Sequence, residues 1–219
     1  MKSRELEAIV IGATGLVGSE LVKQLLIDDD YSKVRVLHRR PTGVKHDKLE
    51  EFIIDFDKPQ TWKDLMQGNV LFSTLGTTMS AAGSKDEQYK VDYTYQYEMA
   101  KAAADNDVEH YVLVSSAGAH PKSRIFYSRM KGELEEAVKK LEFKSIHILQ
   151  PSILSGDRSE NRVGEKIGLA LVKAVSWVPF VKKYRPIRDQ EVATAMRTCV
   201  LRNNLGTHTY KLDEIFNMN

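Results

Sequence analysis

Residues 11–20 read IGATGLVGSE and overlap the end of the apolar run AIVI at residues 8–11. Three glycines, Gly12, Gly15 and Gly18, fall in a G-x-x-G-x-x-G spacing between that run and a helical pattern over residues 16–28. Glycines so placed permit a tight turn and a close approach of the backbone to a diphosphate, which the free N–H groups of the helix N-terminus then receive. A glycine-rich turn that binds nothing is the alternative. We predict a dinucleotide-binding loop with contacts from Gly12, Thr14, Gly15, Leu16, Val17 and Gly18.

Short apolar runs alternate with longer helical patterns up to about residue 155. Uninterrupted apolar strands with helices between them are typical of a parallel sheet covered on both faces, and right-handed crossovers then build a doubly wound sheet. The sequence therefore predicts an α/β Rossmann fold of about seven strands, with ligands at the carboxyl ends of the strands. The expected strands are 8–11, 33–38, 51–56, 69–75, 109–116, 144–150 and a short one near 207–212, and the expected helices are 16–28, 87–105 and 127 to about 142.

The chain length of 219 residues fits a single NAD(P)-binding domain, residues 1–219. The pattern changes after residue 155, where helices are expected over 164–176 and 188–202, separated by the aromatic and basic segment VPFVKKYRP. About 65 residues are too few for an independent substrate domain. Residues 155–219 are therefore expected to contribute a small C-terminal helical lid over the strand ends.

The second expected strand ends in VLHRRP, which places Arg39 and Arg40 where an NAD-preferring protein usually has an acidic residue. The acidic run at residues 28–30 precedes that strand and cannot serve. Two guanidinium groups suit the 2′-phosphate of NADP, because each offers a planar fork of donors to phosphate oxygens. NADP(H) is therefore the preferred cofactor, with Arg39 as the principal contact. NAD(H) and a solvated basic turn are the alternatives.

Residues 126–133 read FYSRMKGE and place Tyr127 four residues before Lys131. On a helix these two side chains share one face, and a lysine ammonium beside a phenol favours the phenolate, as an acid/base catalyst requires. The same Y-x-x-x-K pattern occurs at Tyr97 and Lys101, and chance alone gives about one copy in such a chain. The position of each copy in the fold must decide which one matters.

The chain resembles the atypical short-chain dehydrogenases and, within them, the HIV Tat-interacting oxidoreductase family. The resemblance spans nearly the whole chain and is carried by IGATGLVG (11–18), LGTT (75–78), KVDY (90–93), VSSAGAHPKSRIFYSRMKGELE (114–135) and QPSILSGDR (150–158). It implies that Tyr127 is the general acid/base and that Lys131 favours the phenolate and bonds the nicotinamide ribose. It also implies that Ser115 or Ser116 holds a substrate carbonyl. The other copy, which starts at Tyr97, precedes the fifth strand and is interpreted as a helix surface pair.

The same resemblance implies further contacts with the cofactor. The end of the third strand lies near the adenine, the loop after the fourth strand passes the ribose and nicotinamide, and the segment after the sixth strand lies against the nicotinamide. The residues concerned are Asp55 and Phe56, then Leu75, Gly76 and Thr77, and then Pro151, Ser152 and Ile153. Asp92 stands where many members of the group have asparagine, and Gln150 stands where they commonly have arginine.

A Ser/Tyr/Lys set beside a phosphate loop predicts an NADP(H)-dependent oxidoreductase that transfers hydride to or from a small carbonyl or alcohol. A non-catalytic NADPH-binding regulator or sensor is the alternative, because the C-terminal region offers little dedicated substrate pocket. A nucleotide-sugar epimerase or dehydratase uses the same residues but needs a larger substrate domain. Besides a small-molecule substrate, a second copy of the chain or a regulatory protein partner is compatible with these readings.

Composition and patterning argue against other classes of protein. A net charge of +2 without a basic stripe argues against nucleic-acid binding, and the six histidines show no metal-ligand spacing. His147 is expected to be a packed or edge residue within a strand, and His120 is a candidate for contact with substrate. The most apolar stretch, residues 167–181, is shorter than the roughly 20 residues of a membrane-spanning helix. A single cysteine, Cys199, interpreted as a core residue, and the lack of a signal-peptide pattern predict a cytoplasmic protein.

Overall fold

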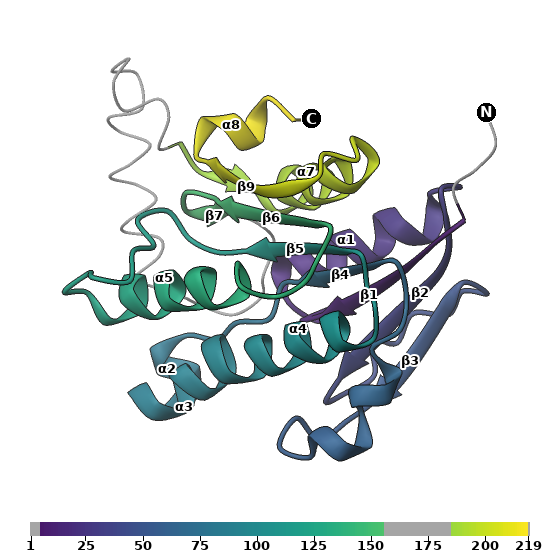
Figure 1. Cartoon of the computed structure of the whole chain (residues 1–219), viewed down its shortest axis with the longest axis horizontal. Helices are drawn as coiled ribbons and strands as arrows, with labels where there is room; N and C mark the ends of the chain where they lie inside the picture. The colour runs from purple at the N-terminus through teal and green to yellow at the C-terminus, as the bar shows by residue number, and fades with distance from the viewer. Residues whose placement is uncertain (1–4, 156–184, 219) are drawn as a thin grey trace.

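The computed structural model describes residues 5–155 and 185–218. Seven parallel strands form one sheet in the order β3-β2-β1-β4-β5-β6-β9 (Figure 1). The strand order reverses between β1 and β4, so the loops after these two strands flank the crevice in which doubly wound sheets bind ligands. The predicted α/β Rossmann fold is confirmed. The strands span Leu6–Ile11 (β1), Tyr31–His38 (β2), Leu49–Ile53 (β3), Val70–Ser73 (β4), His110–Val114 (β5), Ser145–Gln150 (β6) and Gly206–Lys211 (β9).

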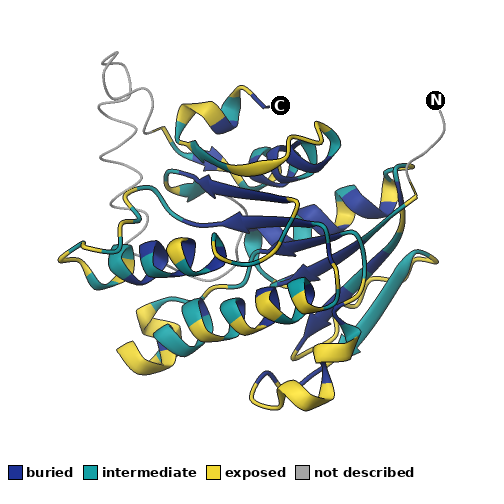
Figure 2. Cartoon of the chain, in the orientation of Figure 1, coloured by how far each residue is buried: buried dark blue, intermediate teal, exposed yellow. Residues whose placement is uncertain are grey.

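Helices cover both faces of the sheet, with α1 and α7 on one face and α4 and α5 on the other (Figure 1). Successive residues of each strand alternate between the two cores. In β1, Ala8 and Val10 pack with α1 and α7, whereas Ile9 and Ile11 pack with α4 and α5. The central strands are therefore buried on both sides, which is why their sequences are apolar throughout (Figure 2). The four helices are Leu16–Ile27 (α1), Gln96–Asp105 (α4), Phe126–Val138 (α5) and Asp189–Leu201 (α7).

The long helix expected around residues 87–105 is present as helical backbone that runs without a break from residue 85 to residue 105, but its middle part is not α-helical. A π-helix over Lys90–Tyr95 separates α3 from α4. π-helical turns are rare and often occur at functional sites, and this one carries Asp92. The remaining short elements are two 3₁₀ turns at Pro59–Thr61 and Lys63–Leu65, α2 (Met79–Ala82), α3 (Lys85–Tyr89), β7 (Leu154–Ser155), β8 (Ile187–Arg188) and α8 (Asp213–Phe216).

Residues 185–218 are built into the sheet and its covering layer. Strand β9 pairs with β6, and α7 packs on α1. Between these helices, Thr194 Oγ1 lies 3.1 Å from Gln24 Oε1, and Arg197 Nε lies 3.2 Å from Asp28 Oδ2. The expected lid helix over 164–176, the apolar stretch 167–181 and most of the VPFVKKYRP segment lie outside the described residues.

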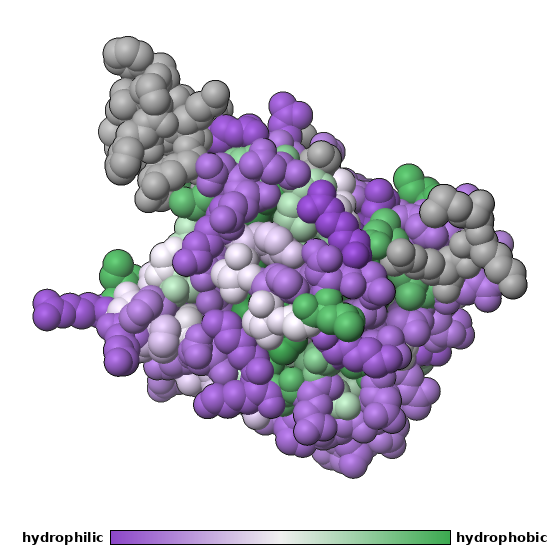
Figure 3. All heavy atoms as spheres, turned by 45° about the horizontal axis from the view of Figure 1, so that its top comes forward, coloured by the Kyte–Doolittle hydropathy of each residue, from purple (hydrophilic) through white to green (hydrophobic). Residues whose placement is uncertain are grey.

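Among the described residues, few large apolar side chains are exposed. Figure 3 shows a face that is mainly hydrophilic, with hydrophobic residues in small, separate groups. Within residues 5–155 and 185–218, no helix combines the length and the apolar character needed to cross a bilayer. Cys199 is fully buried, as expected, and burial raises the pKa of its thiol to about 12. This cysteine is therefore a packing residue rather than a nucleophile.

His147 is fully buried at the centre of β6, also as expected. Its Nδ1 lies 3.2 Å from the hydroxyl of Tyr210, and its ring stacks on His208 with the two ring centroids 5.3 Å apart. Burial, together with the neighbouring His208 and His110, lowers the pKa of His147 to about 4. The imidazole is therefore neutral in the folded protein at every pH at which the protein is expected to function.

We expect His147 to make the folded state sensitive to acid. Because its pKa is lower when folded than the ordinary 6.5, the unfolded chain binds the extra proton, and stability falls as the pH drops from about 6.5 to about 4. The full effect is about 3 kcal/mol. Urea unfolding across this range should show the loss in the wild type and a flatter profile in His147→Phe. His46→Gln, a change at an exposed histidine, should retain the wild-type slope.

Candidate nucleotide-binding and catalytic site

The turn between β1 and α1 is pressed against the segment that follows β4. Gly12 has a left-handed backbone (φ +83°), and a Cβ there would lie 2.5 Å from the backbone nitrogen of Leu75. A Cβ at Gly18 would lie 2.2 Å from the carbonyl oxygen of Gly12 and 2.5 Å from Oγ1 of Thr74. Thr74 Oγ1 in turn donates to the carbonyl of Ile11 at 2.8 Å. Both positions therefore require glycine, and the turn presents bare backbone to a ligand.

We expect Gly18→Ala to destabilise the protein by about 1–3 kcal/mol or more and to weaken dinucleotide binding. The added methyl would displace α1 from the backbone of its own N-terminal turn. Gly206→Ala is the control, because Gly206, at the start of β9, has a left-handed backbone but no atom within 4 Å of the place a Cβ would take. Both variants should lose stability in urea unfolding, but only Gly18→Ala should lose NADPH affinity in calorimetric titration. Equal NADPH affinities in the two variants would contradict the role of the turn.

The N-terminus of α1 is open to an anion. Gly15 is the N-cap residue and provides no capping side chain, and the first turn of the helix contains no acidic residue. The amide of Gly15 donates to the carbonyl of Gly12 at 2.8 Å, which closes the tight turn. By contrast, α7 begins with Asp189 and Glu191 in its first turn. The free N–H groups and the positive end of α1 thus remain available for a phosphate group.

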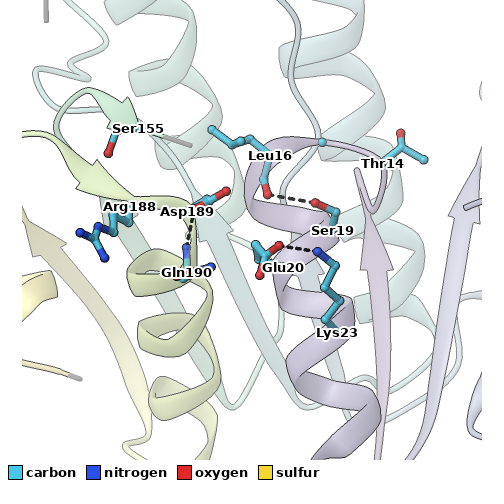
Figure 4. A pocket seen from close by; sticks show the side chains of 10 residues that line it. Thr14, Leu16, Ser19, Glu20, Lys23, Ser155, Arg188, Asp189 and Gln190 are labelled. Atoms are coloured by element: carbon cyan, nitrogen blue, oxygen red, sulfur yellow. Dashed lines mark hydrogen bonds and ion pairs between the residues drawn. The ribbon is translucent and has the colours of Figure 1, made fainter. Parts of the chain in front are cut away.

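A cavity of about 700 Å³ opens beside this helix end, between the first turns of α1 and α7 (Figure 4). Lys23 and Glu20 form an ion pair of 2.6 Å on the α1 side of it. Three of the predicted loop residues, Thr14, Gly15 and Leu16, lie at its rim. The residues that line the cavity are Thr14, Gly15, Leu16, Ser19, Glu20, Lys23, Ser155, Arg188, Asp189 and Gln190.

Arg39 and Arg40 follow β2 and are exposed. Strand β2 pairs with β1 up to Leu37 and Ile11, so both arginines come next to the glycine turn. Among the described residues, neither guanidinium has an ion-pair or hydrogen-bond partner. His38, just before them, is buried, with Nε2 3.4 Å from a carboxylate oxygen of Glu51. The two arginines are therefore free to bind an anionic group at the end of β2.

The two residues expected near the adenine differ in exposure. Asp55 is exposed and forms an ion pair of 3.0 Å with Lys58. Phe56 is 6% exposed, and its ring stacks on Tyr95 with the centroids 5.1 Å apart. The ring of Phe56 therefore belongs to the core beneath the surface, and only its backbone is placed to meet a ligand.

Tyr127 and Lys131 lie one turn apart at the start of α5, which follows the loop after β5. The phenol of Tyr127 is 38% exposed, whereas Lys131 is 3% exposed, with Nζ 6.0 Å from the centroid of the tyrosine ring. In the other copy of the pattern, Lys101 pairs with Asp105 at 2.6 Å on the surface of α4. The two copies are thus physically different, because only Tyr127 has a buried ammonium beside an accessible phenol.

The buried ammonium of Lys131 forms an ion pair with Asp92 on the π-helix, with Nζ 3.1 Å from Oδ1. The second carboxylate oxygen, Oδ2, accepts a hydrogen bond of 2.7 Å from the amide of Thr77. Burial on its own would lower the pKa of Lys131, but Tyr127, Asp92 and Glu135 together outweigh it and hold that pKa above its ordinary value. Lys131 is therefore charged at neutral pH. The sequence analysis assigned no role to Asp92. The acidic residue at a position where many members of the group have asparagine was the feature that could have indicated a charged partner.

Ser115, at the end of β5, is buried and donates its hydroxyl hydrogen bond to Oε1 of Glu135 on α5. Gln150 Nε2, from the end of β6, lies 2.9 Å from each of the Glu135 oxygens. Burial raises the pKa of Glu135, and the hydrogen bonds from Ser115 and Gln150 oppose that rise. Ser116 is only half-buried, with Oγ 3.5 Å from the carbonyl of Ala117. Of the two serines, Ser116 has the more accessible hydroxyl, and its one hydrogen bond is long.

The other residues expected at the site lie on the loops around this edge. Leu75 is half-buried against the core under α4, and Gly76 and Thr77 lie next to Asp92. Pro151 is buried, and its carbonyl accepts from the amide of Ala117 at 2.9 Å. The remaining two are placed as follows: Ser152 donates to the carbonyl of Arg185, and Ile153 is 39% exposed.

Gly132 fixes the loop that precedes α5. A Cβ at this position would lie 2.3 Å from the carbonyl carbon of His120 and 2.4 Å from the nitrogen of Pro121. The ring of His120 is exposed, and its Nδ1 accepts from the amide of Lys122 at 3.1 Å. The glycine of the FYSRMKGE segment therefore lets the loop after β5 pack directly on α5.

The sequence is similar to known nucleotide-binding proteins. A profile of the NAD(P)H-binding family matches residues 12–166. The protein named FMP52, mitochondrial, from Coccidioides immitis is 34% identical over 213 residues, which are 90% of this chain and 87% of that protein. Its Saccharomyces cerevisiae namesake is 40% identical over 161 residues, which are 72% of this chain and 69% of that protein.

Solved structures share the fold. MoeE5 in complex with UDP-glucuronic acid and NAD superposes with a TM-score of 0.72 at 17% identity, over 94% of this chain and 76% of that one. The Bordetella bronchiseptica enzyme WbmH in complex with NAD+ gives a TM-score of 0.69 at 14% identity, over 94% of this chain and 75% of that one. At such identities the likeness establishes the Rossmann architecture and nothing finer.

These comparisons correct two expectations from the sequence. The relatives carry the name FMP52 rather than that of the Tat-interacting oxidoreductases. The cytoplasmic location is wrong, since the same relatives are named mitochondrial, which points to a mitochondrial rather than a cytoplasmic location. The prediction failed because a single cysteine indicates only that a protein resides in a reducing compartment. It does not indicate which reducing compartment that is.

Proposed function

The chain belongs to the NAD(P)H-binding family and is a relative of the FMP52 proteins, and from this premise we propose that it is an NADP(H)-dependent oxidoreductase of the short-chain dehydrogenase type. Its substrate is a small carbonyl or alcohol. The observation that carries the proposal is the buried ammonium of Lys131 one helical turn from the exposed side chain of Tyr127. A structural ion pair alone would not need an accessible phenol beside it.

The described residues fit a dinucleotide. The positions of Gly12 and Gly18 exclude side chains, and the N-terminus of α1 is left for a diphosphate. Arg39 and Arg40 offer unpaired guanidinium groups at the place of the adenosine ribose. NADP(H), when bound, supplies or accepts the hydride. We assign NADP(H) rather than NAD(H) as the preferred form because two unpaired cations follow β2, whereas the nearby carboxylate, that of Glu51 on β3, accepts hydrogen bonds from Thr42.

The side chains at the carboxyl edge of the sheet have separate roles in the proposed reaction. The hydroxyl of Tyr127 donates a proton to a carbonyl oxygen in reduction and accepts one from an alcohol in oxidation. The charged Lys131 has ammonium hydrogens left for a ribose hydroxyl, because its ion pair with Asp92 uses only one of the three. Ser116 donates to the substrate oxygen, since the hydroxyl hydrogen of Ser115 is held by Glu135.

We expect Arg39→Ala to raise the dissociation constant of NADPH by about tenfold or more, because the 2′-phosphate loses one charged hydrogen-bonding partner. The dissociation constant of NADH, which lacks that phosphate, should stay unchanged. Isothermal titration calorimetry with both nucleotides measures the two constants directly. Arg202→Ala, at an exposed arginine after α7, is the matched control and should bind NADPH like the wild type. If Arg39→Ala bound NADPH as tightly as Arg202→Ala, the assignment of the 2′-phosphate contact would be wrong. If the wild type bound neither nucleotide, the oxidoreductase proposal would fail.

A further inference from the structure

Asp92 occupies an unusual position for a carboxylate, since it is 1% exposed and receives a different donor on each oxygen. The ammonium of Lys131 lies 3.1 Å from Oδ1, and the amide of Thr77 lies 2.7 Å from Oδ2. An asparagine has only one acceptor oxygen, so its NH₂ group would face one of these two donors. The site therefore requires a carboxylate, which explains the acidic residue in the KVDY segment.

Further hydrogen bonds fix the position of this carboxylate. Gln96 Nε2 donates to the backbone carbonyl of Asp92 at 2.7 Å, and Gln96 Oε1 accepts from Ser73 Oγ at 2.7 Å. The π-helix is thereby tied to the end of β4. In addition, a Cβ at Gly76 would lie 3.2 Å from Asp92 Oδ1, so the segment after β4 is packed closely on the carboxylate. Gln88 adds a hydrogen bond of 3.3 Å to the carbonyl of Thr77.

These contacts link two elements that, on the proposed function, meet the same half of the cofactor. Lys131 bonds the nicotinamide ribose, and the segment Leu75–Thr77 passes the ribose and nicotinamide. One carboxylate holds the lysine on one oxygen and the segment on the other, so neither can move without the other. The adenosine half, at Arg39 and the end of β2, has no direct contact with the Asp92 carboxylate among the described residues, and the only link to its π-helix on the adenine side is the stacking of Phe56 and the bonding of Asp57 at Tyr95 and Lys90.

We infer that Asp92 is a positioning residue for the nicotinamide half of the cofactor, acting through Lys131 and the amide of Thr77. This inference rests on the proposed function. It holds that Asp92 sets the geometry with which Lys131 and the 75–77 segment receive the ribose, and that the adenosine half binds independently of it. The affinity for the whole dinucleotide should depend on Asp92, and the affinity for its adenosine half should not.

The test compares NADPH with 2′,5′-ADP, which carries the adenosine ribose and the 2′-phosphate but no nicotinamide. For Asp92→Asn we expect the dissociation constant of NADPH to rise about tenfold or more, with loss of the fluorescence enhancement of the bound nicotinamide, and that of 2′,5′-ADP to stay within about twofold. Asp105→Asn, in the exposed pair with Lys101, is the matched control and should change neither constant.

Each result decides the matter. Weakened NADPH binding with unchanged 2′,5′-ADP binding supports the inference. Equal weakening of both ligands shows a general structural role and overturns it, as does an unchanged NADPH constant. Binding of neither ligand by the wild type would instead overturn the proposed function itself.

A measurement on the wild type keeps the inference testable if Asp92→Asn does not fold. Hydrogen exchange of the Thr77 amide, followed by NMR, should slow on addition of NADPH and remain unchanged on addition of 2′,5′-ADP. Equal slowing by both ligands, or by neither, would overturn the link between Asp92 and the nicotinamide half.

Discussion

Tyr127→Phe should lower turnover by about 10²–10⁴-fold while the NADPH dissociation constant stays within about twofold of the wild type. The change removes one oxygen from a side chain that is 38% exposed and has no hydrogen-bond partner among the described residues, so folding has little to lose. What is lost is the group that exchanges a proton with the substrate. Turnover is followed by NADPH absorbance against a panel of small aldehydes, ketones and alcohols, and binding by calorimetry.

The second Y-x-x-x-K copy provides the matched control for that experiment. Tyr97→Phe makes the same chemical change on α4, where the lysine four residues later is engaged by Asp105. It should retain wild-type turnover. A Tyr127→Phe variant that reduced carbonyls as fast as Tyr97→Phe would contradict the acid/base assignment. A wild type that bound NADPH tightly but turned over no member of the panel would favour the non-catalytic regulator.

Lys131→Met is expected to cost about 3–5 kcal/mol of folding free energy, the largest effect on stability that we predict. The ammonium of Lys131 is the only cation that pairs with Asp92 among the described contacts, and Asp92 is 1% exposed. Without the lysine, a buried carboxylate would keep a single hydrogen bond from Thr77. Equilibrium unfolding in urea, monitored by circular dichroism, measures the loss.

Two further variants separate the charge effect from a packing effect. Lys131→Met/Asp92→Leu removes both charges and should recover most of the lost stability, because an apolar pair can replace a buried ion pair at little cost. Lys101→Met breaks an exposed pair whose side chains are 50% and 62% exposed, and it should cost less than about 1 kcal/mol. If Lys131→Met cost no more than Lys101→Met, the buried pair would not contribute as described.

The order of strands and helices could be predicted because both periodicities are local properties of the sequence. Apolar runs buried on both faces marked the parallel strands, and the glycine spacing marked the turn into α1. The π-helix over Lys90–Tyr95 could not be predicted in this way. Its wider turn is held by the side chain of Gln96, which bridges Asp92 and Ser73 across 23 residues of sequence, and no local propensity encodes that contact.

In the candidate site, too, local contacts could be predicted from the sequence and contacts between distant segments could not. Tyr127 and Lys131 are neighbours on one helix, so spacing predicted their proximity. Other contacts of the site join residues of different elements. Lys131 on α5 pairs with Asp92 on the π-helix, and Glu135 on α5 binds Ser115 at the end of β5 and Gln150 at the end of β6. No spacing rule connects these pairs, and they emerge only when the sheet assembles.

The burial of Phe56, by contrast, could be predicted from the sequence. Residues 51–56 read EFIIDF, and the structure buries Ile54 and Phe56 on either side of the exposed Asp55. This alternation of period two is the ordinary sign of side chains that point to opposite sides of an extended backbone. A family resemblance assigned both residues to the nucleotide, whereas the alternation leaves only one side chain at the surface.

The packing of α1 on α7 has a consequence for how the chain is made. The ribosome completes α1 at Ile27, but its partner helix begins only at Asp189. At typical elongation rates the interval is about 10 to 30 seconds. During this time the part of α1 that packs on α7 has no native cover, and the edge of β6 is unpaired until β9 is made. The nascent chain is therefore most prone to aggregate, and most dependent on chaperones, before its last 30 or so residues emerge.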